Sequence, residues 1–215
     1  MSYKCKSYDK TFGDHNCLYH YTTLDSLMKI AESRMLLFNR CDKLNDIIEG
    51  SRSHVKYYVS CFTYEKKETI PMWYIYTRGI NCCPRSNVGV RLCVDNGDFF
   101  TGKIYLDPKN KEECYDASEF GGIFCGKTIY DDANKDRNPT YGNIDPEKPI
   151  GIGIEFTNVP DLGLMGKGTA WAYEKEARFF TLDSQTFNVD KIFVGLEDSF
   201  FDGLRITLSP LLRDE

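Results

Sequence analysis

The sequence predicts one α+β domain built from many short strands and few short helices. The chain has 215 residues and 41% hydrophobic content, enough to close one sizeable core. Aromatic and β-branched residues recur in short runs between turn residues, a pattern typical of strands. Only two segments carry apolar residues at helical spacing, so we do not expect a doubly wound parallel sheet.

The first half of the chain shows a regular order of elements. Residues 18–22 form an aromatic and β-branched run that predicts a strand, and residues 24–31 follow with helical spacing behind Thr23, which can cap a helix. A second apolar run at 35–38 predicts another strand, and the polar stretch 43–46 predicts a loop.

Three further segments complete the regular part of this half, and a loop-rich stretch follows them. Residues 56–63 and 88–95 predict strands. Pro71 stands at a first helical position before an aromatic run at 72–77, which predicts a short helix. From Gly97 to Pro149 the chain is polar and rich in turn residues, so we expect a loop-rich insertion with possible strands at 103–106 and 123–129.

Three strands are predicted near the end of the chain. Runs at 150–156 and 177–182 flank a glycine-rich stretch at 163–168, which lacks the Gly-Lys-Ser/Thr ending of a phosphate-binding loop and is expected to be a mobile loop. Residues 191–195 predict the last strand.

Charge, hydropathy and cysteine content narrow the class of protein. The net charge of −5 and pI near 5.3 disfavour non-specific binding to nucleic acid. No stretch of about 20 apolar residues predicts a membrane span, and residues 1–16 show no signal-peptide core. The nine cysteines contain no CxxC pair, so we expect reduced thiols in a cytoplasmic protein and no metal site.

Two segments at opposite ends of the domain carry the candidate chemistry, residues 18–23 and 171–179. In a strand, alternate side chains share a face, so Glu174, Glu176 and Arg178 are expected to lie on one side. A solvated strand edge with a paired arginine is the alternative. The flanking aromatics Trp171 and Tyr173 favour a partly enclosed groove.

His20 and the aromatic residues of the short helix have two possible roles. His20 lies in the middle of the first strand, where a hydrogen-bonded structural histidine is the alternative to a binding residue. Trp73 and Tyr76 are core aromatics by default, and for Tyr76 a binding role is an equal alternative. The sequence contains no GxGxxG, P-loop, HExxH or GxSxG motif, so the commonest nucleotide-binding, zinc-protease and serine-hydrolase classes are not expected.

These segments resemble the ADP-ribosyltransferase superfamily, in particular an uncharacterised bacterial and phage branch. The resemblance rests on the His-Tyr-Thr strand at 20–22, the Met-Trp-x-x-Tyr helix at 72–76 and the Trp-x-Tyr-Glu-x-Glu-x-Arg motif at 171–178. It implies a split β-sheet core. The sequence departs from the superfamily in lacking a Ser-Thr-Ser element on the second strand.

The resemblance also implies roles for single residues, with NAD as the substrate. His20 would hold the nicotinamide-side ribose, and Tyr76 or Tyr21 would stack on the nicotinamide. Glu176 would be the catalytic carboxylate, with Glu174 as its partner. Trp73 and Arg178 would complete the NAD site.

Three functions from different classes follow from the sequence. The first is an NAD-dependent mono-ADP-ribosyltransferase or NAD glycohydrolase that acts as an intracellular toxin, defence effector or phage modifier, with a protein more expected than nucleic acid as the acceptor. The second is a non-catalytic module that binds a nucleotide or a protein. The third is a metal-dependent nucleic-acid-processing enzyme that uses Asp46, Glu49, Glu174 and Glu176.

Overall fold

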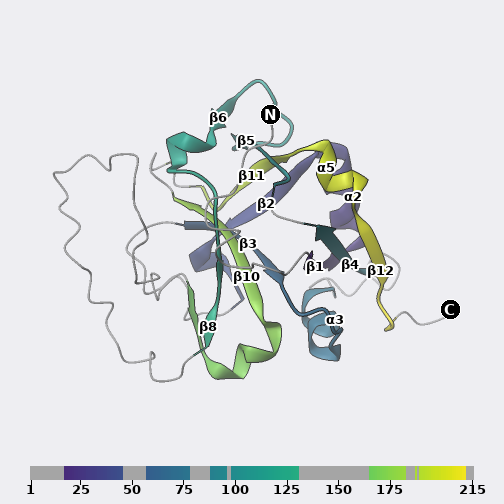
Figure 1. The fold of residues 1–215 in the computed structure, drawn as a ribbon. Helices are drawn as coiled ribbons and strands as arrows, with labels where there is room; N and C mark the ends of the chain where they lie inside the picture. Colours follow the sequence, from purple (N-terminus) through teal and green to yellow (C-terminus); the bar gives the residue numbers. More distant parts are fainter. Residues whose placement is uncertain are drawn as a thin grey trace, which may run out of the picture.

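The fold is described from a computed structural model (Figure 1), which covers residues 17–45, 57–77, 88–95, 98–130, 165–182, 187 and 189–211. The strands are β1 (Cys17–Thr23), β2 (Met35–Arg40), β3 (Tyr57–Thr63), β4 (Gly89–Asp95), β5 (Phe100–Tyr105), β6 (Cys114–Asp116), β7 (Phe124–Lys127), β8 (Ile129–Tyr130), β9 (Gly166–Lys167), β10 (Glu176–Leu182), β11 (Lys191–Leu196) and β12 (Arg205–Leu208). The helices are α2 (Leu24–Ser33), α3 (Ile70–Tyr76) and α5 (Asp198–Asp202), with 3₁₀ turns η1 (Cys41–Lys43), η2 (Ala117–Phe120) and η4 (Thr169–Glu174).

The α+β class predicted from the sequence is confirmed: one large antiparallel sheet dominates, and the helices are few and short. The order along the sheet is β12-β4-β1-β3-β2-β11-β5-β6, with β10 paired to β3 and β7 paired to β10. A separate small sheet joins β8 and β9 in parallel.

Strand β3 is the centre of this arrangement. Along one edge it pairs with β10 from Tyr57 to Thr63. Because a strand has only two edges, β1 and β2 share the other edge. Strand β1 pairs with it at Tyr19↔Thr63, and β2 pairs with it at Asn39↔Val59 and Arg40↔Tyr58. The two strands therefore diverge between these bridges, beside Cys61.

Local sequence explains the helix that connects the two diverging strands. The hydroxyl of Thr23 accepts a hydrogen bond of 3.2 Å from the Ser26 amide, which caps α2 as the sequence predicted. Leu27 and Ile30 face the core from one side of the helix. The helix ends at Arg34, whose backbone is left-handed with φ 60°. In Figure 1, α5 lies close to α2.

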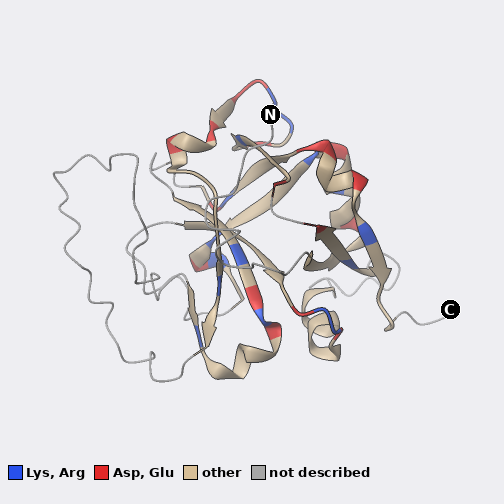
Figure 2. Cartoon of the chain, viewed as in Figure 1, with Lys and Arg blue, Asp and Glu red and all other residues tan. Residues whose placement is uncertain are grey.

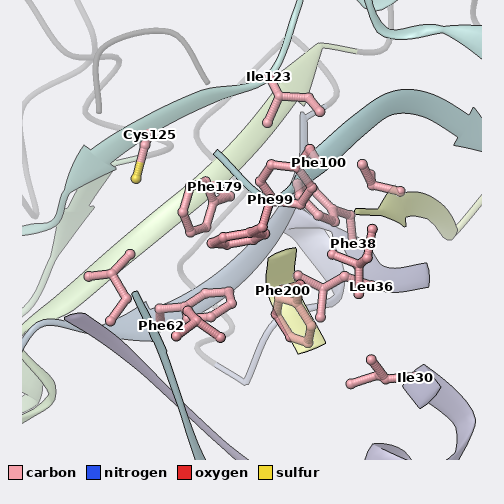
Figure 3. Close-up of a cluster of buried hydrophobic side chains, with 14 of the residues drawn as sticks. Ile30, Leu36, Phe38, Phe62, Phe99, Phe100, Ile123, Cys125, Phe179 and Phe200 are labelled. Atoms are coloured by element: carbon pink, nitrogen blue, oxygen red, sulfur yellow. The ribbon is translucent and has the colours of Figure 1, made fainter. Parts of the chain in front are cut away.

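A cluster of phenylalanines fills one face of the sheet (Figure 3). Phe179 on β10 lies edge-on to Phe62, Phe99 and Phe100, with ring centroids 5.2–5.5 Å apart. Phe200 of α5 packs on Phe99 with a centroid distance of 5.3 Å. Edge-to-face packing at this spacing adds to the free energy gained by burial. The helix α5 therefore closes the core that the strands form.

The opposite face of the central strands carries two smaller apolar clusters and the polar residues of β10. Trp73 and Met72 of α3 pack on Tyr21, and Phe180 packs with Val59. Since neighbouring side chains in a strand point to opposite faces, Glu176 and Arg178 lie on this second face while Phe179 lies in the main core. One strand thus anchors the core and presents the charged residues.

Several sequence predictions are corrected by the fold. The first part of the predicted insertion supplies β5, β6, η2, β7 and β8, and Phe99, Phe100 and Phe120 belong to the core, so it is integral to the sheet. Helix α5 and strands β6 and β12 were not predicted. The second part of the insertion and the predicted strand at 150–156 lie outside the described residues.

We expect Phe179→Ala to lower the free energy of unfolding by about 3–5 kcal/mol, because it removes a fully buried ring and leaves a cavity. Ile206→Ala is the matched control, since Ile206 is 49% exposed and should change stability by less than about 0.5 kcal/mol. Urea unfolding measures both. Equal losses in the two variants would contradict this account of the core.

Candidate functional site

A pocket of about 1030 Å³ lies where β1 and β2 diverge from β3. Cys61 and Thr63 of β3 line it, together with residues of β1, β2, α2 and α3. Among the residues predicted as functional, five line this pocket: His20, Tyr21, Tyr76, Glu174 and Glu176. A volume of this order is typical of ligand sites, which range over roughly 300–1,000 Å³.

Glu174 and Glu176 reach the pocket by a route that the sequence pattern did not predict. Glu174 ends the 3₁₀ turn η4 and is not part of a strand, whereas Glu176 begins β10. Lys175 between them is left-handed, with φ 41°. This turn, and not strand alternation, brings the two carboxylates to one side. Both side chains are buried, with 2% and 5% of the residue exposed.

Two buried cations neutralise the two carboxylates. Lys167 Nζ lies 2.6 Å from Glu174 Oε2 and 3.5 Å from Glu176 Oε2. Arg178 donates to Glu176 Oε2 at 2.8 Å. Figure 2 shows acidic and basic segments alternating from the end of η4 into β10, near the centre of the view. These two pairs form a four-charge cluster, Lys167, Glu174, Glu176 and Arg178.

The two carboxylates have opposite electrostatic environments. For Glu176, burial opposes ionisation, but Arg178 and Lys167 outweigh it and hold the pKa at about 2. For Glu174, burial raises the pKa above its usual value, Lys167 lowers it in part, and the charge of Glu176 raises it further. Glu176 is therefore an ionised carboxylate at neutral pH, and Glu174 is the one of the two that binds a proton more readily.

Three hydroxyl groups, from α3, β8 and the residue between β7 and β8, lie around the acidic pair. The Tyr76 hydroxyl of α3 donates to Glu174 Oε1. The Thr128 hydroxyl lies 3.3 Å from Glu176 Oε2, and the Glu176 amide donates to the Tyr130 hydroxyl at 2.8 Å. Burial and the neighbouring carboxylates raise the pKa of Tyr76, so its hydroxyl keeps its proton and acts as a donor.

His20 is fixed in one tautomer by a hydrogen bond to β3, made where β1 and β2 diverge from that strand. Its Nδ1 lies 2.8 Å from the carbonyl oxygen of Cys61. A carbonyl only accepts, so Nδ1 carries the proton. Burial lowers the pKa of His20, so the ring is neutral at pH 7 and Nε2 is an acceptor. The ring packs on Phe62, with centroids 4.9 Å apart.

Two residues predicted to bind NAD lie behind the pocket. Trp73 is fully buried and donates its indole hydrogen to Glu68 at 3.1 Å. Arg178 is also fully buried, and neither residue lines the pocket. Their predicted contacts with NAD stay predictions. In the structure, Trp73 supports Tyr21 with an edge-on contact of 4.9 Å, and Arg178 holds Glu176.

Lys167 is the charged residue beside the described acidic pair that sequence reasoning missed, and Thr128 and Tyr130 were missed as well. Lys167 belongs to the glycine-rich stretch expected to be a mobile loop, whereas the structure places Gly166–Lys167 in β9, paired with β8. No spacing in the sequence links it to the acidic pair. Asp46 and Glu49, the other acidic candidates, lie outside the described residues.

Away from the pocket, two cysteines and one aspartate, residue types that can bind a metal ion, lie close together. Cys17, Cys93 and Asp95 bring their ligand atoms within 4.8 Å of one another. The Arg205 guanidinium occupies this group, with Nη2 at 3.2 Å from Cys17 Sγ, 3.0 Å from Cys93 Sγ and 2.6 Å from Asp95 Oδ1. The protein's own cation therefore balances this carboxylate.

No family model, curated protein or solved structure matches the chain. None of the helices within the described ranges has the length and apolar character needed to cross a membrane.

We expect the stability contributed by Glu176 to be lost in acid. A folded-state pKa of about 2, below the ordinary 4.5, stabilises the fold above pH 4.5, and this contribution is lost as pH falls towards about 2. Urea unfolding at several pH values measures the difference in the free energy of unfolding between wild type and Glu176→Gln. This difference should shrink as the pH falls over that window. The control Glu112→Gln changes an exposed residue and should show no such decrease. A difference for Glu176→Gln that stays constant down to pH 2 would contradict the assignment.

Proposed function

We propose that this protein is an NAD-consuming ADP-ribosyltransferase-like enzyme, either a mono-ADP-ribosyltransferase or an NAD glycohydrolase. The observation that carries the proposal is that His20, Tyr76, Glu174 and Glu176 line one pocket, although they come from four different elements. The divergence of β1 and β2 along one edge of β3 supports the split sheet that the resemblance implies.

Glu176 has the properties that cleavage of NAD requires. The bond between the nicotinamide nitrogen and ribose C1′ breaks with its electron pair going to the nitrogen, so positive charge develops on the ribose. A carboxylate fixed beside the ribose stabilises that charge electrostatically. Glu176 is ionised and held in place by Arg178, Lys167 and Thr128 through its Oε2 atom.

Tyr76 and His20 supply the binding contacts in this proposal. The half-buried Tyr76 is better placed than Tyr21 to stack on nicotinamide, because Tyr21 is 7% exposed and packs on Trp73. The Nε2 atom of His20 is an acceptor for a ribose hydroxyl, since Nδ1 is engaged by the Cys61 carbonyl.

The second half of the reaction needs a nucleophile and a base. Water or a side chain of the acceptor forms the new bond to C1′ and loses a proton. Glu174 takes that proton in our proposal, since its pKa is raised and it lies beside Glu176. The net charge of −5 favours a protein over nucleic acid as the acceptor. An intracellular role as a toxin, defence effector or phage modifier belongs to the same proposal.

The alternatives are a binding module and a metal-dependent nuclease. In the described site, the carboxylates of Glu174 and Glu176 already have the cations Lys167 and Arg178 as partners, which does not favour a divalent metal between them. A binding module would hold NAD or another nucleotide in the same pocket without turnover.

We expect Glu176→Gln to reduce nicotinamide release from NAD by at least about 100-fold with most of the NAD affinity retained, because the amide keeps the shape but not the charge. Glu174→Gln should be milder towards NAD cleavage and alter use of the acceptor. The assay measures nicotinamide with and without cell extract, and a thermal shift on adding NAD. Binding without turnover in the wild-type protein would favour the binding module, and neither binding nor turnover would end the NAD proposal.

His20→Ala should weaken NAD binding about tenfold, since it removes one acceptor used in both the ground state and the transition state. His20→Asn separates this role from the structural one, because its amide can still donate to the Cys61 carbonyl but offers no group at the Nε2 position. Calorimetric titration with NAD measures both variants. Wild-type affinity in His20→Asn would show that the histidine is structural.

A further inference from the structure

Lys167 is a buried ammonium group that contacts the two carboxylates of the proposed site but does not itself line the pocket. Its side chain is 4% exposed. Its Nζ atom contacts both carboxylates, at 2.6 Å for Glu174 and 3.5 Å for Glu176, and lies 4.6 Å from the ring centroid of Trp171. Burying an ammonium is costly unless it is paired, so these contacts hold the side chain in place.

The charges around Lys167 balance within the described part of the site. The titratable and charged groups facing this cluster come from α3, β3, β8, η4 and β10: Tyr76, Cys61, Tyr130, Tyr173, Glu174, Glu176 and Arg178. Arg178 pairs with Glu176, and the shorter contact of Lys167 is with Glu174. Each carboxylate therefore has one cation as its main partner.

Tyr76 and Lys167 donate to different oxygens of the Glu174 carboxylate. Glu174 accepts from the Tyr76 hydroxyl with Oε1 and from Lys167 with Oε2. An ionised carboxylate accepts at both oxygens, whereas a protonated one must donate from one of them. Without the ammonium, Glu174 would be a buried charge beside the charge of Glu176, and like charges at such a site drive one carboxylate to bind a proton.

We propose that Lys167 is a positioning residue that keeps Glu174 ionised beside Glu176, so that Glu174 fixes the Tyr76 hydroxyl and is free to take the proton of the acceptor. The electrostatic part of this inference needs only the four-charge cluster. The catalytic part rests on the proposed function. Lys167 is the largest cause lowering the pKa of Glu174, which agrees with this role.

The first measurement follows the carboxyl carbon of Glu174 by NMR across pH, with Glu174→Gln identifying its signal. In Lys167→Met, Glu174 should titrate at least about one pH unit higher than in wild type, a tenfold or greater change in proton affinity. Lys167→Arg should restore most of the shift. An unchanged titration of Glu174 in Lys167→Met would overturn the proposal.

The matched control is Lys175→Met. Lys175 stands in the sequence between the same two glutamates, but its ammonium is exposed and pairs with Glu65 at 2.5 Å. Methionine keeps the length of the side chain, so this variant removes one positive charge near the site in sequence but not in space. Glu174 should titrate as in wild type. A shift as large as that of Lys167→Met would overturn the specific role of Lys167.

A double variant keeps the proposal testable if Lys167→Met unfolds easily. If the ammonium acts by neutralising Glu174, then Lys167→Met/Glu174→Gln should be more stable than Lys167→Met alone at pH 7, because no unpaired buried charge remains. Lys167→Met should also gain stability relative to wild type as pH falls, since its Glu174 then binds a proton. If the stability losses of Lys167→Met and Glu174→Gln simply add up in the double variant at pH 7, the proposal is contradicted.

The pH profile of nicotinamide release separates this inference from the proposed function. If Lys167 acts through Glu174, the acid limb of the pH profile in Lys167→Met should shift to higher pH, as the titration of Glu174 does. A profile that does not move while Glu174 does would overturn the catalytic part. If wild type releases no nicotinamide but the titration of Glu174 shifts as expected, the proposed function fails and the electrostatic role of Lys167 stands.

Discussion

The pairing of β3 constrains the whole molecule. Strand β10 takes one edge of β3 from Tyr57 to Thr63, so β1 and β2 must share the other edge. They meet it at opposite ends, β1 at Thr63 and β2 at Tyr58 and Val59. Along their other edges, β1 pairs with β4 and β2 pairs with β11. The opening beside Cys61 is thus a consequence of sheet pairing, and His20 reaches across it to the Cys61 carbonyl.

Strand β10 links this opening to the core. Strand alternation places Ala177 and Phe179 among the buried phenylalanines and places Glu176 and Arg178 on the pocket side. Ala177 follows Glu176, and Ala177 and Phe179 flank Arg178, so core residues fix the backbone that carries the carboxylate. Because Arg178 is fully buried, its guanidinium holds Glu176 from behind without occupying the pocket. The site therefore depends on the same packing that stabilises the fold.

Sequence patterns predicted those parts of the structure whose cause is local. The strand at 18–22 and its capped helix need only the apolar spacing and Thr23, and both lie where predicted. Alternation misplaced Glu174, because the left-handed backbone at Lys175 interrupts the strand pattern before β10 begins. Helix α5 has five residues and β12 four, too few for a periodic signal. Lys167 joins the site only through tertiary contacts, which no spacing in the sequence records.

The energetics of the four-charge cluster favour a functional reason for its presence. Desolvating charged groups costs several kcal/mol per ion, and apolar residues of similar volume are often at least as stable as a buried ion pair. A cluster with a purely structural role would gain little by bordering a pocket. In this structure the two carboxylates line the pocket while Arg178 does not, and the two acids differ in pKa, one lowered and one raised. Paired carboxylates with separated pKa values are what acid–base chemistry at neutral pH requires. This difference between Glu174 and Glu176 supports our proposal of an enzyme, because binding alone does not need it.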